Sequence, residues 1–126
     1  MTLGQLRTHQ DLKAWRRSID FVEDVYRLTD RFPERERFGL TSQLRRAAVS
    51  VPSNIAEGAA RGTRSEFLRF LNIARSSLSE ARTQLIIADR LGYLNSAKVE
   101  FESLDECFRM LNGLIRRLQS GGGPNH

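Results

Sequence analysis

The sequence contains few of the residue types on which most catalytic and metal sites depend. It has one cysteine, Cys107, and two histidines, His9 and His126, both in terminal segments. A single cysteine cannot form a disulfide within the chain, and so few histidines remove most histidine-based catalysis and most transition-metal sites. The composition therefore predicts a protein that is not an enzyme and holds no metal or other cofactor.

Long apolar runs are also missing. No segment approaches the roughly 18 apolar residues that a membrane-spanning helix needs, and the N-terminal MTLGQLRTHQDLKAW has no apolar core of the kind found in secretion signals. The sequence also lacks a phosphate-binding glycine loop and the Glu-x-x-His step of di-iron helical bundles. Together with the unpaired cysteine, these absences predict a cytoplasmic protein without membrane contact.

The charged residues that are present are mostly arginines. Of 20 basic residues only Lys13 and Lys98 are lysines, the formal net charge is +5, and residues 41–92 carry +4 of it. Arginine binds phosphate in a bidentate fork and stacks on bases better than lysine does. Nucleic acid is therefore a candidate partner, although a GC-rich gene would give the same arginine bias without one.

Apolar residues recur at steps of three and four in four segments, which predicts four amphipathic helices. Their expected bounds are Asp11 to Arg31, Thr41 or Ser42 to Gly58, the Thr63–Glu66 capping box to Gly92, and Asn95 or Ser96 to Leu118. Pro52 lies inside the second helix and predicts a kink or break there. Short connections favour an all-α, antiparallel up-down four-helix bundle, one domain over residues 11–119 with a disordered tail at 120–126.

Two of these helices have more apolar residues than one stripe requires. In the first helix, the main stripe consists of Leu12, Trp15, Ile19, Val22 and Tyr26. A second stripe lies beside it and consists of Phe21, Val25, Leu28 and Phe32. The third helix adds Phe70, Ile73, Ile86 and Ile87 outside its main stripe. An exposed apolar patch would favour self-association, whereas wide stripes can also wrap a single tight core.

A polar group surrounds the position of Pro52 and continues on the third helix. Its members are Ser53, Asn54, Glu57, Glu80 and Gln84. They could form a small polar pocket or a hydrogen-bond network that satisfies the backbone groups freed by the proline. The network is the favoured interpretation, because no nucleophile or metal ligand accompanies the group.

Five arginines are the predicted nucleic-acid-binding residues: Arg45, Arg46, Arg61, Arg64 and Arg69. The first two are expected on the outer side of the second helix, and the others lie around the start of the third, where free backbone amides also attract phosphate. Only Phe38 and Tyr93 are aromatic residues near loops. The expected binding is therefore directed to phosphate, with little base stacking and little sequence preference.

The segment FGLTSQLRRAAVSVPSNIAEG at 38–58, with EFLRFL at 66–71 and ARSSLSE at 74–80, resembles the 23S rRNA-intervening sequence protein family over roughly residues 11–94. The resemblance implies a four-helix bundle assembled as a ring-like homopentamer, with no established reaction. A related branch of proteins assists diversity-generating retroelements and contacts a reverse transcriptase and nucleic acid. We therefore expect a non-enzymatic, homo-oligomeric protein that binds RNA or DNA; the alternative is a structural or protein-interaction scaffold with an acidic partner.

Overall fold

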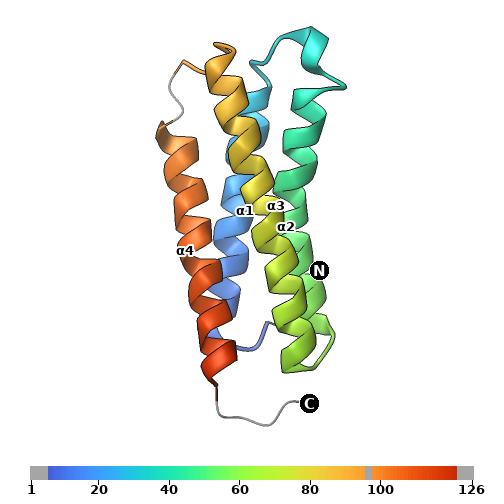
Figure 1. Cartoon of the computed structure of the whole chain (residues 1–126), viewed down its shortest axis with the longest axis vertical. Helices are drawn as coiled ribbons and strands as arrows, with labels where there is room; N and C mark the ends of the chain where they lie inside the picture. Colours follow the sequence, from blue (N-terminus) through green and yellow to red (C-terminus); the bar gives the residue numbers. More distant parts are fainter. Residues whose placement is uncertain (1–5, 96–97, 122–126) are drawn as a thin grey trace.

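The computed structural model describes residues 6–95 and 98–121. Within these ranges the secondary structure consists of helices without any strand: α1 (His9–Thr29), the short 3-10 helix η1 (Glu34–Glu36), α2 (Leu40–Ala60), α3 (Arg64–Arg90) and α4 (Lys98–Ser120). The four α-helices run along the long axis of the molecule (Figure 1). The predicted all-α class and the four helices are confirmed.

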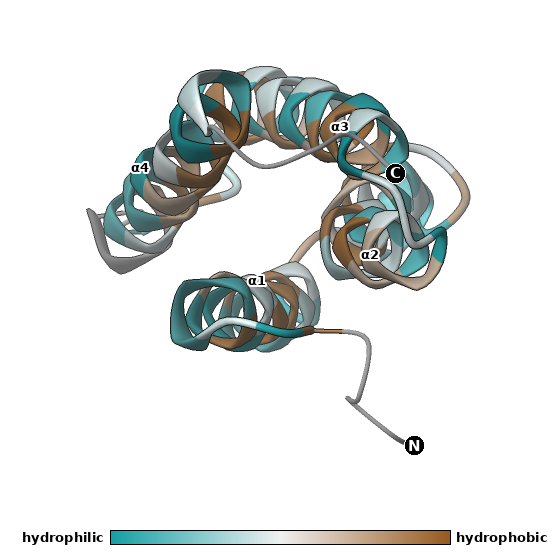
Figure 2. Ribbon diagram, turned by 90° about the horizontal axis from the view of Figure 1, so that it is seen from below, coloured by the Kyte–Doolittle hydropathy of each residue, from teal (hydrophilic) through white to brown (hydrophobic). Residues whose placement is uncertain are grey.

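The four helices surround one apolar core. Each packs against two neighbours, α1 against α2 and α4, and α3 against α2 and α4. Viewed along the bundle, apolar positions face the interior and polar positions face outward (Figure 2). Phe21, Leu44, Leu71 and Leu104, one from each helix, are fully buried. Apolar positions at steps of three and four residues therefore face the core, although in α1 the second predicted stripe does so and not the main one.

Helix α2 packs more extensively on α3 than on any other helix. A Cβ atom added to Gly58 would lie 2.6 Å from the Cβ of Phe70 and 3.3 Å from the carbonyl oxygen of Phe67. Alanines such as Ala74 and Ala81 are buried further along α3. Small residues therefore let the two backbones approach at the α2–α3 turn.

Local capping explains where three of the helices begin. Thr8 and Asp11 form a reciprocal capping box, so α1 starts before Asp11 and includes His9, which was expected outside any helix. Thr63 accepts the amide of Glu66 and begins α3 as predicted. Helix α2 begins at Leu40, earlier than predicted, because the Glu36 carboxylate accepts the Leu40 amide at 3.1 Å.

The helix ends agree with the expectations from the sequence in part. Gly92 follows the end of α3 with a φ of 79°, the left-handed conformation in which glycine is favoured. Ser120 belongs to α4 and not to a tail, and residues 122–126 lie outside the described ranges, as does Ser96. The described helices include none that is long and apolar enough to cross a membrane.

Helix α2 continues through Pro52, so of the predicted kink or break the break is wrong. Two polar side chains bond the backbone of the preceding turn: Ser53 Oγ donates to the Val49 carbonyl at 2.8 Å, and Asn54 Nδ2 donates to the Ser50 carbonyl at 2.8 Å. A proline removes only its own donor, and the surrounding packing keeps the helix intact on both sides.

Of the two apolar stripes of α1, the one predicted to be secondary is buried in the core. Phe21, Val25, Leu28 and Phe32 are buried in the core. The predicted main stripe is half-buried, and its last member, Tyr26, is exposed. On α3, Phe70 is buried, whereas Ile73, Ile86 and Ile87 are exposed as predicted. The chain therefore buries one stripe of α1 and leaves the other partly open.

Candidate nucleic-acid interface

The five arginines predicted to bind nucleic acid do not form one patch. Arg61, Arg64 and Arg69 lie around the α2–α3 turn, whereas Arg45 and Arg46 lie in the first half of α2. Arg61 lies 15 positions after Arg46 along α2 and its C-cap, a rise of about 22 Å at 1.5 Å per residue. The two groups therefore occupy different halves of the bundle.

Arg45 connects two helices. Its Nε donates to Thr29 Oγ1 at 2.7 Å and its Nη2 donates to Asp30 Oδ1 at 2.9 Å. The guanidinium also lies over the ring of Tyr26, 4.5 Å from its centroid. Arg46 beside it is exposed and has no bonding partner among the described residues. Most of the donor capacity of Arg45 is therefore used within the protein.

The arginines at the α2–α3 turn share two carboxylates. Arg61 pairs with Glu57 at 3.1 Å, and Arg69 pairs with Glu66 at 2.9 Å. The hydrogen bond from Arg69 lowers the pKa of Glu66, and the same contact raises the pKa of Arg69. Arg64 instead donates to the carbonyl oxygen of Gly121 at 2.6 Å and has no carboxylate partner among the described residues.

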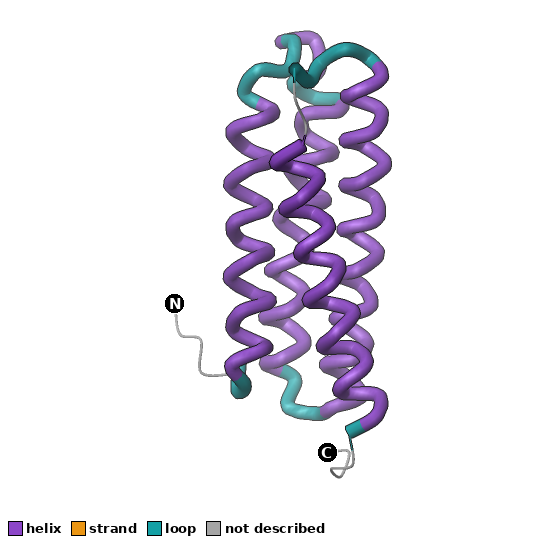
Figure 3. The backbone as a smooth tube through the Cα atoms, turned by 90° about the vertical axis from the view of Figure 1, so that its left-hand side faces the viewer, coloured by secondary structure: helices purple, strands orange, loops and turns teal. Residues whose placement is uncertain are grey.

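Charge is distributed unevenly along the bundle. The halves of the helices nearest the α2–α3 turn and the described chain ends comprise residues 6–18, 51–76 and 110–121, and we call this half the basic end (Figure 3). It holds ten arginines and lysines and three carboxylates, a net charge of +7. The opposite half, residues 19–50 and 77–109, holds ten basic and twelve acidic residues, a net charge of −2.

Most basic side chains of the basic end lack a carboxylate partner. Its three acidic residues, Asp11, Glu57 and Glu66, pair with Arg117, Arg61 and Arg69. The other basic side chains of this end form no ion pair with a described residue: Arg7, Lys13, Arg16, Arg17, Arg64, Arg75 and Arg116. Apart from Arg64, none of these was among the predicted binding residues. Their positive charge is therefore not cancelled locally.

The opposite half of the bundle contains a buttressed carboxylate, Glu36, and the most exposed aromatic ring among the described residues. Tyr93 donates to Glu36 at 2.7 Å, and this bond lowers the pKa of Glu36 and raises that of Tyr93. Phe38, with an exposed fraction of 86%, lies here beside the Arg37 guanidinium. The one fully open aromatic ring among the described residues is therefore far from the basic end.

Hydrogen bonds do not join the five residues of the predicted polar network. Ser53 and Asn54 bond the backbone of α2, and Glu57 pairs with Arg61. Glu80 is exposed without a partner among the described residues, and the Oε1 atom of buried Gln84 has none either. Three of the residues act locally within the second half of α2, and the other two lie one turn apart on α3.

Cys107 lies in the core. Burial raises the pKa of its thiol to about 12, so the thiolate that metal binding or nucleophilic attack needs is disfavoured. Within residues 6–95 and 98–121, no three histidine, cysteine or acidic side chains gather in a way that could hold a metal ion.

The sequence matches a known protein family, and the fold is similar to that of a solved protein. The family model described as 23S rRNA-intervening sequence protein matches residues 10–113. The chain belongs to the 23S rRNA-intervening sequence protein family. A solved protein of unknown function from the S23 ribosomal protein family of Bacteroides thetaiotaomicron is similar in fold, with a TM-score of 0.78 and 22% identity over 85% of this chain and 98% of that one. Among proteins with curated descriptions, none matches the chain.

Proposed function

We propose that this member of the 23S rRNA-intervening sequence protein family is a non-enzymatic accessory protein that binds RNA or DNA through its basic end. The observation that carries the proposal is the net charge of +7 on that half, against −2 on the other. Proteins bind nucleic-acid backbones by neutralising phosphates with arginine and lysine, which releases counterions. Arginines without a carboxylate partner are available for this neutralisation.

The composition of the basic end also supports a particular mode of binding. Phe67 and Phe70 are buried and Trp15 is half-buried, so little aromatic surface is available there for stacking on bases. Contacts to phosphate fix a protein on the backbone without reading the bases. Binding should therefore be sensitive to salt and show little preference between sequences.

The proposal includes self-association in the cytoplasm as a ring-like homopentamer of antiparallel up-down bundles. Exposed apolar side chains support association: Tyr26, Phe38, Val49, Ile73, Ile86, Ile87 and Leu91. The number of five subunits and the ring rest on the family resemblance, and the short connections at alternating ends of the bundle support the antiparallel order. Several basic ends in one assembly would multiply weak phosphate contacts into stronger binding.

The test measures binding to a fluorescent single-stranded RNA and to a DNA duplex, each in two unrelated sequences, over a series of salt concentrations. We expect all four to bind at low salt, with affinities that fall linearly on a logarithmic salt scale and differ little between sequences. Light scattering on the same samples should give a mass several times the 14.4 kDa of one chain. A protein that binds none of the probes at low salt would instead support the scaffold alternative.

A further inference from the structure

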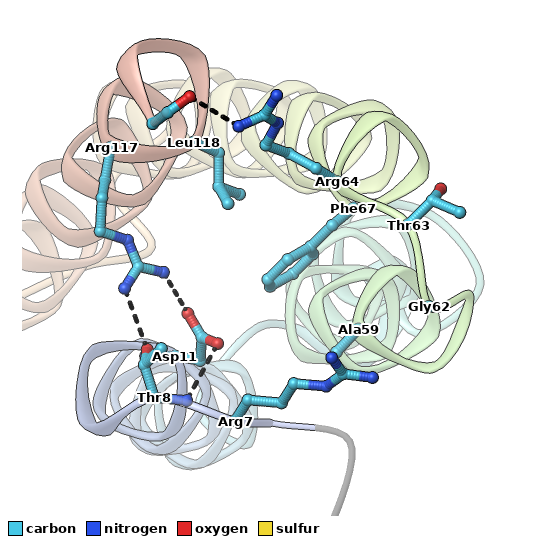
Figure 4. A pocket seen from close by; sticks show the side chains of 11 residues that line it. Arg7, Thr8, Asp11, Ala59, Gly62, Thr63, Arg64, Phe67, Arg117 and Leu118 are labelled. Atoms are coloured by element: carbon cyan, nitrogen blue, oxygen red, sulfur yellow. Dashed lines mark hydrogen bonds and ion pairs between the residues drawn. The ribbon is translucent and has the colours of Figure 1, made fainter. Parts of the chain in front are cut away.

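A cavity of about 350 Å³ opens within the basic end. Its walls come from the segment before α1, the α2–α3 turn and the last turn of α4, so residues far apart in the sequence meet there (Figure 4). Pockets that bind small molecules in proteins begin at about this size. The cavity is independent of whether the outer surface of the basic end binds nucleic acid.

Three guanidinium groups from three elements surround the cavity: Arg7, Arg64 and Arg117. Arg117 donates to Asp11 Oδ1 at 2.7 Å and to Thr8 Oγ1 at 3.2 Å. The second oxygen of the Asp11 carboxylate accepts the Thr8 amide at 3.3 Å, and the residue is only 4% exposed. The single carboxylate of the site is thus occupied by groups of the protein itself.

The two remaining arginines have donors to spare. Arg64 makes one hydrogen bond of 2.6 Å, from Nη1 to the Gly121 carbonyl, and Arg7 is exposed with no partner among the described residues. Because Asp11 offsets Arg117 alone, the lining keeps a net charge of +2. Guanidinium groups bind carboxylate and phosphate oxygens in a bidentate geometry. The rim of the cavity is therefore suited to an oxyanion.

The inner wall of the cavity is apolar. Ala59, Phe67 and Leu118 line it, and the side chains of Phe67 and Leu118 point into the space between the helices (Figure 4). An inorganic ion would leave this surface in water, whereas an apolar group would cover it and gain the free energy of burial. The cationic rim and the apolar wall together favour a ligand that has both an anionic group and an apolar group.

We propose that this cavity binds a small organic oxyanion, a carboxylate or phosphomonoester carried on an apolar body. The oxyanion contacts Arg64, the exposed Arg7 adds positive charge from the other side of the cavity (Figure 4), and the apolar body packs on Phe67 and Leu118. The Arg117–Asp11 pair holds α4 against α1 and thereby shapes the cavity.

Calorimetric titration of the full chain with 1-naphthyl phosphate, 1-naphthoate, 1-naphthol and inorganic phosphate tests this proposal. We expect the naphthyl phosphate or the naphthoate to bind with a Kd on the order of 0.1 mM. Neutral 1-naphthol and inorganic phosphate should each bind about tenfold more weakly, because each lacks one of the two recognised parts. The comparison between the two organic anions identifies the preferred oxyanion.

Matched variants separate the cavity from the general charge of the basic end. Arg7→Gln and Arg64→Gln should each weaken binding of the organic anion about tenfold. Arg116→Gln removes the same charge from an exposed residue of α4 that does not line the cavity, and should leave the Kd unchanged. Equal losses in all three variants, or 1-naphthol binding as tightly as the anions, would overturn the proposal.

Discussion

The two ends of the bundle contain equal numbers of basic residues but differ in what surrounds them. At the basic end three carboxylates serve ten basic side chains, whereas the opposite half has twelve carboxylates for its ten. In that opposite half Arg45 bridges Asp30 and Thr29, and Arg82 pairs with Asp105. The number of arginines therefore does not distinguish the two ends, whereas the shortage of nearby carboxylates does, and the proposed interface rests on that difference.

The largest effect is expected where the two helices of the basic end approach most closely. Gly58→Ala should lower the free energy of unfolding by about 1–3 kcal/mol, because the new Cβ would lie 2.6 Å from the Phe70 Cβ atom. Gly113→Ala is the matched control: it also lies inside a helix, with nothing within 4 Å of the added atom. That control should gain up to about 1 kcal/mol from helix propensity. Chemical denaturation of both variants checks the difference, and equal stabilities would mean that α2 and α3 do not touch at Gly58.

Acid should weaken both ends, through one carboxylate at each. The pKa values of Glu66 and Glu36 are lowered below 4.5, chiefly by hydrogen bonds from Arg69 and Tyr93. The folded state therefore binds protons less readily than the unfolded chain, so these contributions are complete above about pH 4.5 and are lost as the pH falls through the lowered values. The Tm should drop over that range, and less steeply in Glu66→Gln and Glu36→Gln. Glu80→Gln, which removes an exposed carboxylate, should follow the parent; identical curves for all three variants would contradict the assignment.

The smallest effect is expected at the exposed ring of the opposite end. Phe38→Ala should leave both the Tm and the affinity for single-stranded RNA within error of the parent, since the ring is 86% exposed and lies away from the basic end. A ring that stacked on a base would contribute about 1–3 kcal/mol. Fluorescence anisotropy would reveal such a loss, and its appearance would move the interface to the η1 end.

Much of the fold followed from local patterns. The periods of three and four, the Thr63 cap and Gly92 marked the helices because each signal lies within one or two turns of the residue it controls. The sequence alone did not determine which stripe of α1 is buried. Both stripes are apolar, and the neighbouring helices decide which one faces the core. The same dependence explains why Pro52 could be accommodated without a break.

The candidate interface was predictable only in part. Arg61 with Glu57 and Arg69 with Glu66 are spaced by four and three residues, so their pairing could have been read from the sequence. The partners of Arg45 come from a different helix and its end. The basic end itself combines three stretches that are distant in the chain, and counting charge in one continuous window, such as residues 41–92, cannot reveal it.

Two double charge reversals test most directly whether the basic end, and not the overall charge, binds nucleic acid. One variant carries Arg7→Glu and Arg116→Glu at the basic end, and the other carries Arg46→Glu and Arg90→Glu in the opposite half. All four residues are exposed and form no ion pair with a described residue, so both variants change the net charge equally. Affinity for a single-stranded RNA is measured across salt concentrations, with circular dichroism and light scattering as controls for folding and assembly. We predict that the first variant binds about tenfold or more weakly, with a salt slope shallower by about 0.7 for each phosphate that it no longer neutralises, while the second binds nearly as the parent does. Equally weakened binding in the two variants, or weaker binding by the second, would contradict the assignment of the interface to the basic end.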